Sequence, residues 1–413
     1  MSASARALVT WSTSTPATSP APCSESPEAA AVPLDDSDRR FLERCLTLAR
    51  RGRGRVSPNP MVGAVLTRRG EVLAEGHHRR VGGPHAEIDA LERIAANDAT
   101  DARGATLYVN LEPCCHHGRT PPCVDRIVEA GIARVVCCHR DPDPKVAGAG
   151  FARLVEAGIE VAVGGPVRRA VELNLPFLTA RSLGRVAVTL KWAMSLDGKI
   201  ATRGGDSQWI SSPAGRRWAV RLRDEHDAIL VGSGTVLADD PRLTRRSPRS
   251  RGDIVRVVLD RRLRTPPGAA LFAEAGPVLI FTEAPHDGRH ESLQAAGPRV
   301  EVIMCQAVEP LAVARELCRR GLNSLLVEGG GEILEAFRSA GAFDRVAVCV
   351  APRLIGGREA ASAFAGVGAE RLEDASRLAA PRVSRAEGDV LLHALRRGVL
   401  DDLVRAVGEP AAS

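Results

Sequence analysis

Apolar and polar positions along the chain follow two periods, one typical of strands and one typical of helices. Between residues 36 and 182, short apolar runs bounded by turn residues alternate with stretches whose apolar positions recur every three or four residues. The pattern predicts helices over 37–51, 84–94, 124–130 and 151–157, and strands over 61–67, 72–76, 106–111, 134–138 and 160–163. Strands and helices that alternate in this way predict a three-layer α/β domain over 36–182.

The pattern breaks near 181–185, and a second α/β domain is predicted over 185–397. Its strands are expected at 186–192, 228–231, 256–259, 278–282, 300–304, 324–327 and 345–350, with helices at 311–320 and 332–340. Residues 1–35 are rich in Ala, Ser, Thr and Pro without apolar periodicity, which predicts a disordered tail. Residues 398–413 are predicted to be a frayed C-terminal tail.

Composition and charge narrow the class of partner. The 413 residues are 44% apolar and 26% charged, and no window approaches eighteen uninterrupted apolar residues, so a membrane-spanning helix is not expected. The net charge is only +6 and aromatic residues make up 3%, which is unfavourable for a nucleic-acid surface. A small anionic molecule is therefore the expected ligand, with no nucleic acid and no membrane as partner.

Lysine is scarce among the cations. Of the 56 Lys and Arg residues, only Lys145, Lys191 and Lys199 are lysines. A lysine in such an arginine-rich chain is a candidate for a role that the planar, permanently charged guanidinium cannot fill. Chance survival is the alternative explanation for each of the three.

Cysteine and histidine gather in one region. Of the ten cysteines and ten histidines, eleven fall between residues 77 and 139. Disulfides are not expected in a long chain with this clustering, which instead favours a metal site in a reducing compartment, and hence a cytoplasmic protein.

Four residues in this region match the requirements of hydrolytic zinc. His85 and Glu87 form an H-x-E motif on the expected helix, and Cys114 and Cys123 each follow a proline. One imidazole and two thiolates leave a fourth position for water, whose pKa zinc lowers from about 15.7 toward about 7. This order of residues is that of zinc deaminases, in which the glutamate moves protons. A structural zinc site with Cys115 as fourth ligand is the alternative.

The second half lacks the G-x-G-x-x-G fingerprint of a Rossmann dinucleotide site. It has instead Glu328-Gly329-Gly330-Gly331-Glu332 between an expected strand and an expected helix. Glycines there allow backbone N–H groups and the helix N-terminus to approach a phosphate, although many such turns are glycine-rich for packing alone.

The first half resembles the deaminase part of the bifunctional riboflavin-biosynthesis deaminase/reductases. The matching motifs are PNPMVG at 58–63, HAE at 85–87, LEPCCHHGRTPPC at 111–123 and DPDPKVAGAG at 141–150. The resemblance implies a cytidine-deaminase-like fold and one Zn²⁺ bound by His85, Cys114 and Cys123, with Glu87 as proton shuttle. It also implies that Asn59 reads the pyrimidine, and that His77 and the loop 116–119 lie on the phosphate side.

The second half resembles the reductase part of the same family, so that the resemblance covers about residues 37–395. The motifs are TLKWAMSLDGK at 189–199, GDSQWI at 205–210, VGSGTVLADDPRLT at 231–244, EGG at 328–330 and APRLIGG at 351–357. The resemblance implies a dihydrofolate-reductase-like fold that binds NADPH through Ala193, Trp209, Thr235, Asp239, Gly330, Gly331 and Glu332. It implies substrate contacts from Lys191, Ser207, Arg223, Leu243, Arg246 and Glu328.

The implied function joins two reactions of one pyrimidine ribosyl phosphate. Zinc-dependent hydrolysis removes an exocyclic amine from 2,5-diamino-6-ribosylamino-4(3H)-pyrimidinone 5′-phosphate, and NADPH then reduces the ribosyl chain of the resulting uracil to ribityl. Three alternatives remain: a deaminase that edits nucleic acid, a non-catalytic relative, and a chain with only one of the two activities. A homo-oligomer is also expected.

Overall fold

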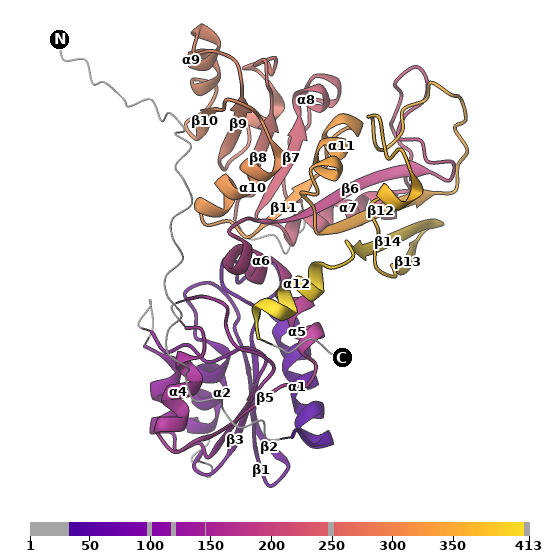
Figure 1. The fold of residues 1–413 in the computed structure, drawn as a ribbon. Helices are drawn as coiled ribbons and strands as arrows, with labels where there is room; N and C mark the ends of the chain where they lie inside the picture. Colours follow the sequence, from indigo (N-terminus) through magenta and orange to yellow (C-terminus); the bar gives the residue numbers. More distant parts are fainter. Residues whose placement is uncertain (1–32, 97–100, 117–120, 145, 247–251, 409–413) are drawn as a thin grey trace, which may run out of the picture.

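The computed structural model describes residues 33–96, 101–116, 121–144, 146–246 and 252–408, and the chain folds into two α/β domains (Figure 1). The N-terminal domain lies below and the larger second domain above in this view. This arrangement confirms the predicted fold class and the order of the two domains. Among the described residues, no helix combines the length and the apolar character needed to cross a lipid bilayer.

The N-terminal domain is built on a five-stranded sheet with the order β2-β1-β3-β4-β5. The strands are β1 (Gly63–Arg68), β2 (Glu71–His77), β3 (Thr106–Val109), β4 (Arg134–Cys137) and β5 (Glu160–Val163). Helices α2 (Ala86–Ala95), α3 (Cys123–Glu129) and α4 (Ala149–Glu156) pack on one face of the sheet. Helices α1 (Asp36–Ala49) and α5 (Val167–Leu173) pack on the other, which gives the predicted three layers.

The second domain has a nine-stranded sheet with the order β10-β9-β8-β7-β11-β6-β12-β14-β13. Its strands are β6 (Ala187–Ser195), β7 (Ala228–Gly232), β8 (Val255–Leu259), β9 (Val278–Thr282), β10 (Val300–Met304), β11 (Ser324–Val327), β12 (Arg345–Ala351), β13 (Arg382–Ala386) and β14 (Asp389–Leu395). Its α-helices are α7 (Pro213–Asp224), α8 (Ser233–Asp239), α9 (Gly288–Gln294), α10 (Pro310–Arg319) and α11 (Gly331–Ser339).

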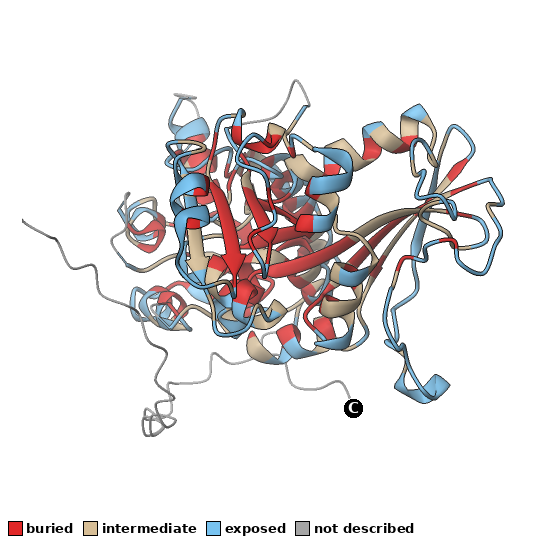
Figure 2. Cartoon of the chain, turned by 90° about the horizontal axis from the view of Figure 1, so that it is seen from above, coloured by how far each residue is buried: buried red, intermediate tan, exposed pale blue. Residues whose placement is uncertain are grey.

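Most of the larger sheet is buried (Figure 2), whereas its edge strands β10 and β13 have no buried residue. In the strand order, β11 and β6 lie beside each other near the middle. They pair in parallel, with Val327 opposite Leu190, so the carboxyl end of β11 meets the middle of β6. This pairing places Glu328 next to Lys191. Residues far apart in the sequence are therefore brought together by the sheet itself.

The C-terminal end differs from the sequence-based prediction. Residues Val399–Ala406 form helix α12, so the prediction of a frayed end over 398–413 was wrong for this segment. Val399, Leu403, Val404 and Val407 are buried in one cluster with side chains of α5 and of α6 (Leu175–Leu183). Burial of this apolar face stabilises the helix, and it returns the end of the chain to the N-terminal domain (Figure 1).

The beginning of the first domain also differs from the prediction. Asp35 caps α1: its side chain accepts a hydrogen bond from the Asp38 N–H at 2.7 Å. Leu34 packs against the apolar cluster under α1. Residues 33–35 thus belong to the folded domain rather than to a tail, whereas residues 1–32 lie outside the described part of the chain.

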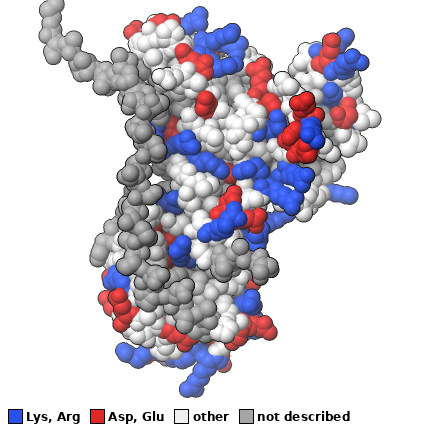
Figure 3. All heavy atoms as spheres, in the orientation of Figure 1, with Lys and Arg blue, Asp and Glu red and all other residues white. Residues whose placement is uncertain are grey.

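A cleft of about 1040 Å³ lies where the two domains meet, and both domains line it. Its walls include arginines from each domain, among them Arg53, Arg169, Arg221 and Arg345. Arginine side chains also gather on the face of the molecule at this level (Figure 3). Asn59 and Asn323 lie at the same cleft, one from each domain.

Candidate active sites

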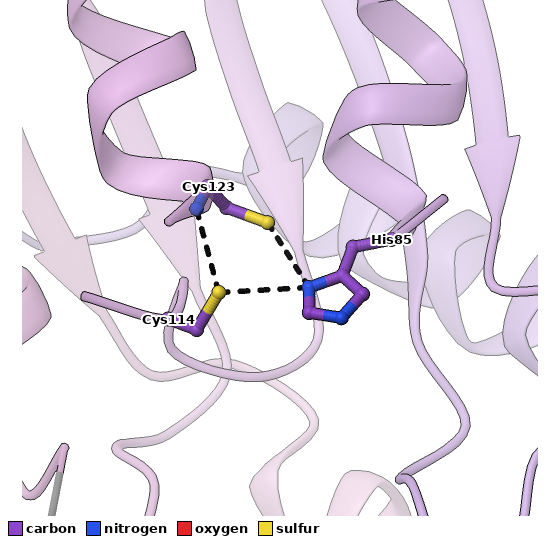
Figure 4. A group of neighbouring side chains, drawn as sticks. All are labelled: His85, Cys114 and Cys123. Carbon is purple, nitrogen blue, oxygen red and sulfur yellow. Dashed lines mark hydrogen bonds between the residues drawn. The ribbon is translucent and has the colours of Figure 1, made fainter. Parts of the chain in front are cut away.

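Three side chains from separate elements of the N-terminal domain converge at the carboxyl end of β3 (Figure 4). His85 is the residue before α2, Cys114 lies in the loop after β3, and Cys123 is the first residue of α3. His85 Nδ1 is 3.2 Å from Cys123 Sγ and 3.5 Å from Cys114 Sγ. The Cys123 backbone N–H donates to Cys114 Sγ at 3.4 Å. The structure thus brings together the three residues predicted as metal ligands.

The donor set and spacing of this group fit zinc. All three ligand atoms lie within 4.8 Å of one another. Zinc bonds of about 2.0–2.3 Å in a tetrahedron require ligand atoms less than about 4 Å apart, close to the distances observed. Cys115 is outside this group in the described part of the chain, which disfavours a closed four-ligand site. Three protein ligands leave the fourth position of a tetrahedron for water.

Burial and hydrogen bonds in this group shift the pKa values of Cys114, His85 and Glu87. The hydrogen bond from Cys123 lowers the pKa of the Cys114 thiol to about 4 despite burial. The contact with Cys114 raises the pKa of His85 to about 9. Glu87 is the second residue of α2, two positions after His85. It is 4% exposed, and burial raises the pKa of its carboxyl group. A carboxyl group with a raised pKa is suited to give and take protons near neutral pH.

Glu112 holds the loop that carries Cys114. Its buried carboxylate accepts backbone hydrogen bonds from Asp141 at 2.9 Å, Gly148 at 3.1 Å and Gly150 at 2.9 Å. A Cβ atom at position 150 would lie only 2.3 Å from the Pro113 carbonyl oxygen. Glu112 and Gly150 therefore pack against each other and fix the position of the loop that carries Cys114.

Asn59 lies beside a histidine that the sequence analysis did not select. Its Nδ2 donates to Nε2 of His78 at 3.1 Å, and Nδ1 of His78 donates to the Pro84 carbonyl at 2.8 Å. The His78 and His85 rings meet edge to face at 5.5 Å. The signal that could have identified His78 is its place directly after a strand and seven residues before His85.

Of the residues predicted on the phosphate side, the structure describes His77 and His116, and neither belongs to the metal-ligand group. His77 ends β2 half-buried, and its backbone N–H donates to Asp89 Oδ2 at 3.1 Å. Burial lowers the pKa of His77. His116 is exposed, and residues 117–119 of the predicted phosphate loop lie outside the described residues.

The second domain brings three predicted substrate residues into one charged cluster. Glu328, directly after β11, accepts two hydrogen bonds from Arg223, at 2.9 and 3.0 Å. Lys191 Nζ lies 3.6 Å from Glu328 Oε2, the oxygen that also accepts a hydrogen bond from Arg223 Nη2. Burial opposes ionisation of Glu328, but the positive charges of Lys191 and Arg223 outweigh it and lower its pKa to about 2. Glu328 is therefore a carboxylate throughout the neutral range.

Arg223 has fewer free donors than a dedicated phosphate clamp. Besides its pair with Glu328, it donates to the Thr244 carbonyl oxygen at 3.0 Å. The other predicted substrate residues differ in exposure. Arg246 is exposed and Ser207 is half-buried, whereas Leu243 is buried and has a left-handed φ of 53°. The arrangement gives Arg223 a role in orienting Glu328, and leaves Arg246 accessible.

Three predicted cofactor residues, Gly330, Gly331 and Glu332, lie at the start of α11, and Thr235 lies beside Gly330. Gly330 is the N-cap residue of this helix, and a Cβ there would meet only Thr235 Oγ1, at 3.8 Å. At Gly331 a Cβ would lie 2.9 Å from Ala365 Cβ and from the Ser362 carbonyl. Gly331 is thus required by packing, whereas Gly330 leaves the backbone open beside Thr235.

The other predicted cofactor residues lie on three further segments. Ala193 is half-buried on β6, Trp209 is 59% exposed beneath the Arg216 guanidinium, and Asp239 is the exposed last residue of α8. Glu332 is exposed in the first turn of α11.

The two sites and folds define an enzyme that joins a zinc-binding deaminase domain to a reductase domain. Residues 35–139 match the cytidine and deoxycytidylate deaminase zinc-binding region, and residues 186–386 match the RibD C-terminal domain. The chain belongs to the RibD family, the bifunctional deaminase/reductases of riboflavin biosynthesis.

Relatives of similar length support this assignment. The riboflavin biosynthesis protein RibD of Bacillus amyloliquefaciens is 42% identical over 357 residues, 86% of this chain and 95% of the relative. That of Escherichia coli K12 is 38% identical over 372 residues, 86% of this chain and 98% of the relative. The structure of Acinetobacter baumannii RibD matches with a TM-score of 0.79 at 34% identity, covering 87% of this chain and 99% of that one.

A Thermotoga maritima structure gives the two activities explicitly. It is described as a diaminohydroxyphosphoribosylaminopyrimidine deaminase/5-amino-6-(5-phosphoribosylamino)uracil reductase. It matches with a TM-score of 0.77 at 37% identity, over 87% of this chain and 99% of that one. The match extends over both domains, so the comparison concerns the two sites together.

Proposed function

We propose that this chain deaminates 2,5-diamino-6-ribosylamino-4(3H)-pyrimidinone 5′-phosphate and then reduces the ribosyl chain of 5-amino-6-(5-phosphoribosylamino)uracil with NADPH. The observation that carries the proposal is the His85–Cys114–Cys123 group with buried Glu87, in a chain that also carries the Lys191–Glu328–Arg223 cluster. The first reaction consumes water and releases ammonia. The second adds a hydride and a proton.

In the deamination, His85, Cys114 and Cys123 would hold one zinc ion, and Glu87 would move protons. When bound, zinc would polarise a water molecule and lower its pKa toward neutrality. Glu87 would take a proton from the attacking water, an uptake that its raised pKa favours, and would then give it to the departing amine. Asn59, oriented by His78, presents its amide to the pyrimidine edge.

In the reduction, the charged cluster would hold the ribosylamine while NADPH supplies the hydride. The ribosylamine opens to an imine at C1′, which is the electrophile that a hydride requires. Lys191 can donate to ribose hydroxyls and assist proton movement, because an ammonium group is compact and rotatable. Glu328 keeps Lys191 and Arg223 in place, and the exposed Arg246 is available for the 5′-phosphate.

The proposal is tested by incubating the purified, zinc-loaded protein with the diaminopyrimidine substrate, with and without NADPH, followed by mass spectrometry. Without NADPH, we expect the uracil intermediate and ammonia. With NADPH, we expect the ribityl product. Ammonia release without reduction of the supplied intermediate would leave the one-activity alternative, and absence of both reactions would overturn the proposal.

We also propose that the protein is cytoplasmic. The cysteines of the described residues are free thiols, which is compatible with a reducing environment. A homo-oligomer is also proposed, and light scattering of the purified chain measures it directly.

A further inference from the structure

One hydrogen bond crosses from the reductase domain to the loop that carries Asn59. Asn323, the residue before β11, donates from Nδ2 to the Pro58 carbonyl oxygen at 2.7 Å. Asn323 is only 5% exposed. Pro58 is exposed, so the bond is partly buried, and its length is that of a well-formed amide–carbonyl hydrogen bond.

The backbone on the Asn323 side is fixed in both directions. Its N–H donates to Asp227 Oδ2 at 2.9 Å, and its carbonyl accepts from the Ala187 N–H at 2.8 Å. The next residue, Ser324, also bonds the Asp227 carboxylate, through its N–H at 3.0 Å and its hydroxyl at 2.9 Å. The Asn323 amide is therefore presented from a rigid point of the larger sheet.

The Pro58 side leads directly to the deaminase site. Asn59 follows Pro58 in the chain, and its side chain donates to His78, whose ring contacts His85. The far end of the same loop is held by the deaminase domain itself: Asn174 Oδ1 accepts from the Met61 N–H at 2.8 Å. The N-terminal domain also holds the loop through the Asn59 N–H, which donates to the Val56 carbonyl oxygen at 2.7 Å, and through Asn110 Nδ2, which donates to the Met61 carbonyl oxygen at 3.0 Å. Among the hydrogen bonds of the described residues, Asn323 supplies the donor to the Pro58 carbonyl oxygen.

We infer that Asn323 is a positioning residue for deamination, through which the reductase domain sets the place of Asn59. The inference rests on the proposed role of Asn59 in binding the pyrimidine. Loss of the bond leaves the Pro58 carbonyl oxygen without its donor from the reductase domain, directly before Asn59 in the chain. The Asn59 amide then meets the substrate less often in the right position, so binding is weakened more than proton transfer at Glu87.

The test compares Asn323→Leu, which keeps the size but removes the donor, with Ser324→Ala. The control loses two hydrogen bonds with Asp227 on the same strand end, since the Ser324 hydroxyl donates to Oδ2 and accepts from the Asp227 N–H, but it leaves Pro58 untouched. For Asn323→Leu we expect the deamination KM to rise about three- to tenfold with kcat within about twofold, the span expected for one neutral hydrogen bond. Zinc content and reduction of supplied intermediate should be unchanged, and Ser324→Ala should leave the deamination KM unaltered.

Asn323→Ala serves as a second variant if the leucine prevents folding, and Asn59→Ala separates the inference from the proposed function. If Asn59→Ala impairs deamination but Asn323→Leu and Asn323→Ala do not, the positioning role is overturned while the role of Asn59 stands. If Asn59→Ala leaves deamination intact, the proposed role of Asn59 fails. A KM rise of equal size in Ser324→Ala would also overturn the inference, because it would reflect a loosened strand.

Discussion

The candidate zinc ligands lie within residues 85–123, whereas the charged cluster of the reductase draws on residues 191–328. The first group is assembled by neighbouring elements, namely the starts of two helices and one loop. The second is assembled by the pairing of β6 with β11 and by α7. A metal site requires particular residue types at short spacings, which can be recognised in the sequence. A site formed by strand pairing joins distant residues, so no local sequence pattern identifies it.

The two sites also differ in how their charges are balanced. In the reductase cluster, Glu328 lies between two cations and is neutralised by the protein itself. In the deaminase site, the Cys114 thiol and the buried Glu87 lie near His85. Because a histidine that binds zinc is a neutral imidazole, the metal itself would supply the positive charge there. Substitutions should therefore affect mainly chemistry at the first site, and both chemistry and stability at the second.

The largest effect is expected for Glu87→Gln. The amide cannot carry the proton, so deamination should fall about 10²–10⁴-fold while zinc content and reduction of supplied intermediate are unchanged. Ammonia release and metal analysis on the same preparation measure both. Cys115→Ser is a matched control that should retain zinc, and retained ammonia release in a zinc-replete Glu87→Gln protein would contradict the role of Glu87.

Glu328→Gln should lower stability as well as reduction. Two largely buried cations would lose their counter-charge, a change that typically costs about 3–5 kcal/mol of unfolding free energy. Because the pKa of Glu328 falls from the ordinary 4.5 to about 2 on folding, its stabilising contribution is complete above about pH 4.5 and is lost as the pH falls toward 2.

Urea unfolding of both proteins at several pH values checks this prediction. The stability gap between parent and Glu328→Gln should be widest near neutral pH and should narrow below about pH 4.5. Deamination should continue in the variant near pH 7. A gap that stays constant down to pH 3 would show that the ionisation of Glu328 does not stabilise the fold.

The elements that the sequence predicted well are those with strong apolar patterns. Strands β5, β9, β10 and β11 have the predicted boundaries, because each is an apolar run bounded by turn residues. Strand β13 has mostly exposed, polar positions and owes its existence to pairing with β14, which no local pattern encodes. Helix α12 has a suitable apolar spacing at Val399, Leu403 and Val404, but only contact with α5 and α6 makes so short a helix stable.

The sites show the same division. His85, Cys114 and Cys123 could be selected from residue type and spacing, and the structure brings them together. The sequence offered only the position of His78 after a strand, and no signal for Asn323, because the contacts of these residues with Asn59 and Pro58 arise only after folding. The cluster of Lys191, Arg223 and Glu328 came from family resemblance, and its pattern of hydrogen bonds follows from the strand register.

A smaller effect, confined to the second site, is expected for Lys191→Arg. The planar guanidinium retains the charge next to Glu328 but is bulkier and effectively never releases its proton. Misplacement of the substrate by about 1 Å can cost up to about 100-fold in rate, so most NADPH-dependent reduction should be lost. The uracil intermediate should accumulate while deamination continues, which mass spectrometry measures. Reduction at the parent rate would mean that a lysine is not required there.

The smallest effect is expected for Asp35→Ala, which lies outside both sites. Asp35 accepts a hydrogen bond from the Asp38 N–H, and the Asp38 side chain accepts one from the Asp35 N–H at 3.3 Å. Removal of such a cap costs about 0.5–2 kcal/mol, because an N–H at the helix start loses its acceptor. Thermal unfolding should therefore occur at a lower temperature, with both activities unchanged at 25 °C. An unchanged melting temperature would place residues 33–35 back in the tail, and a loss of deamination alone would mean that α1 affects the zinc site directly.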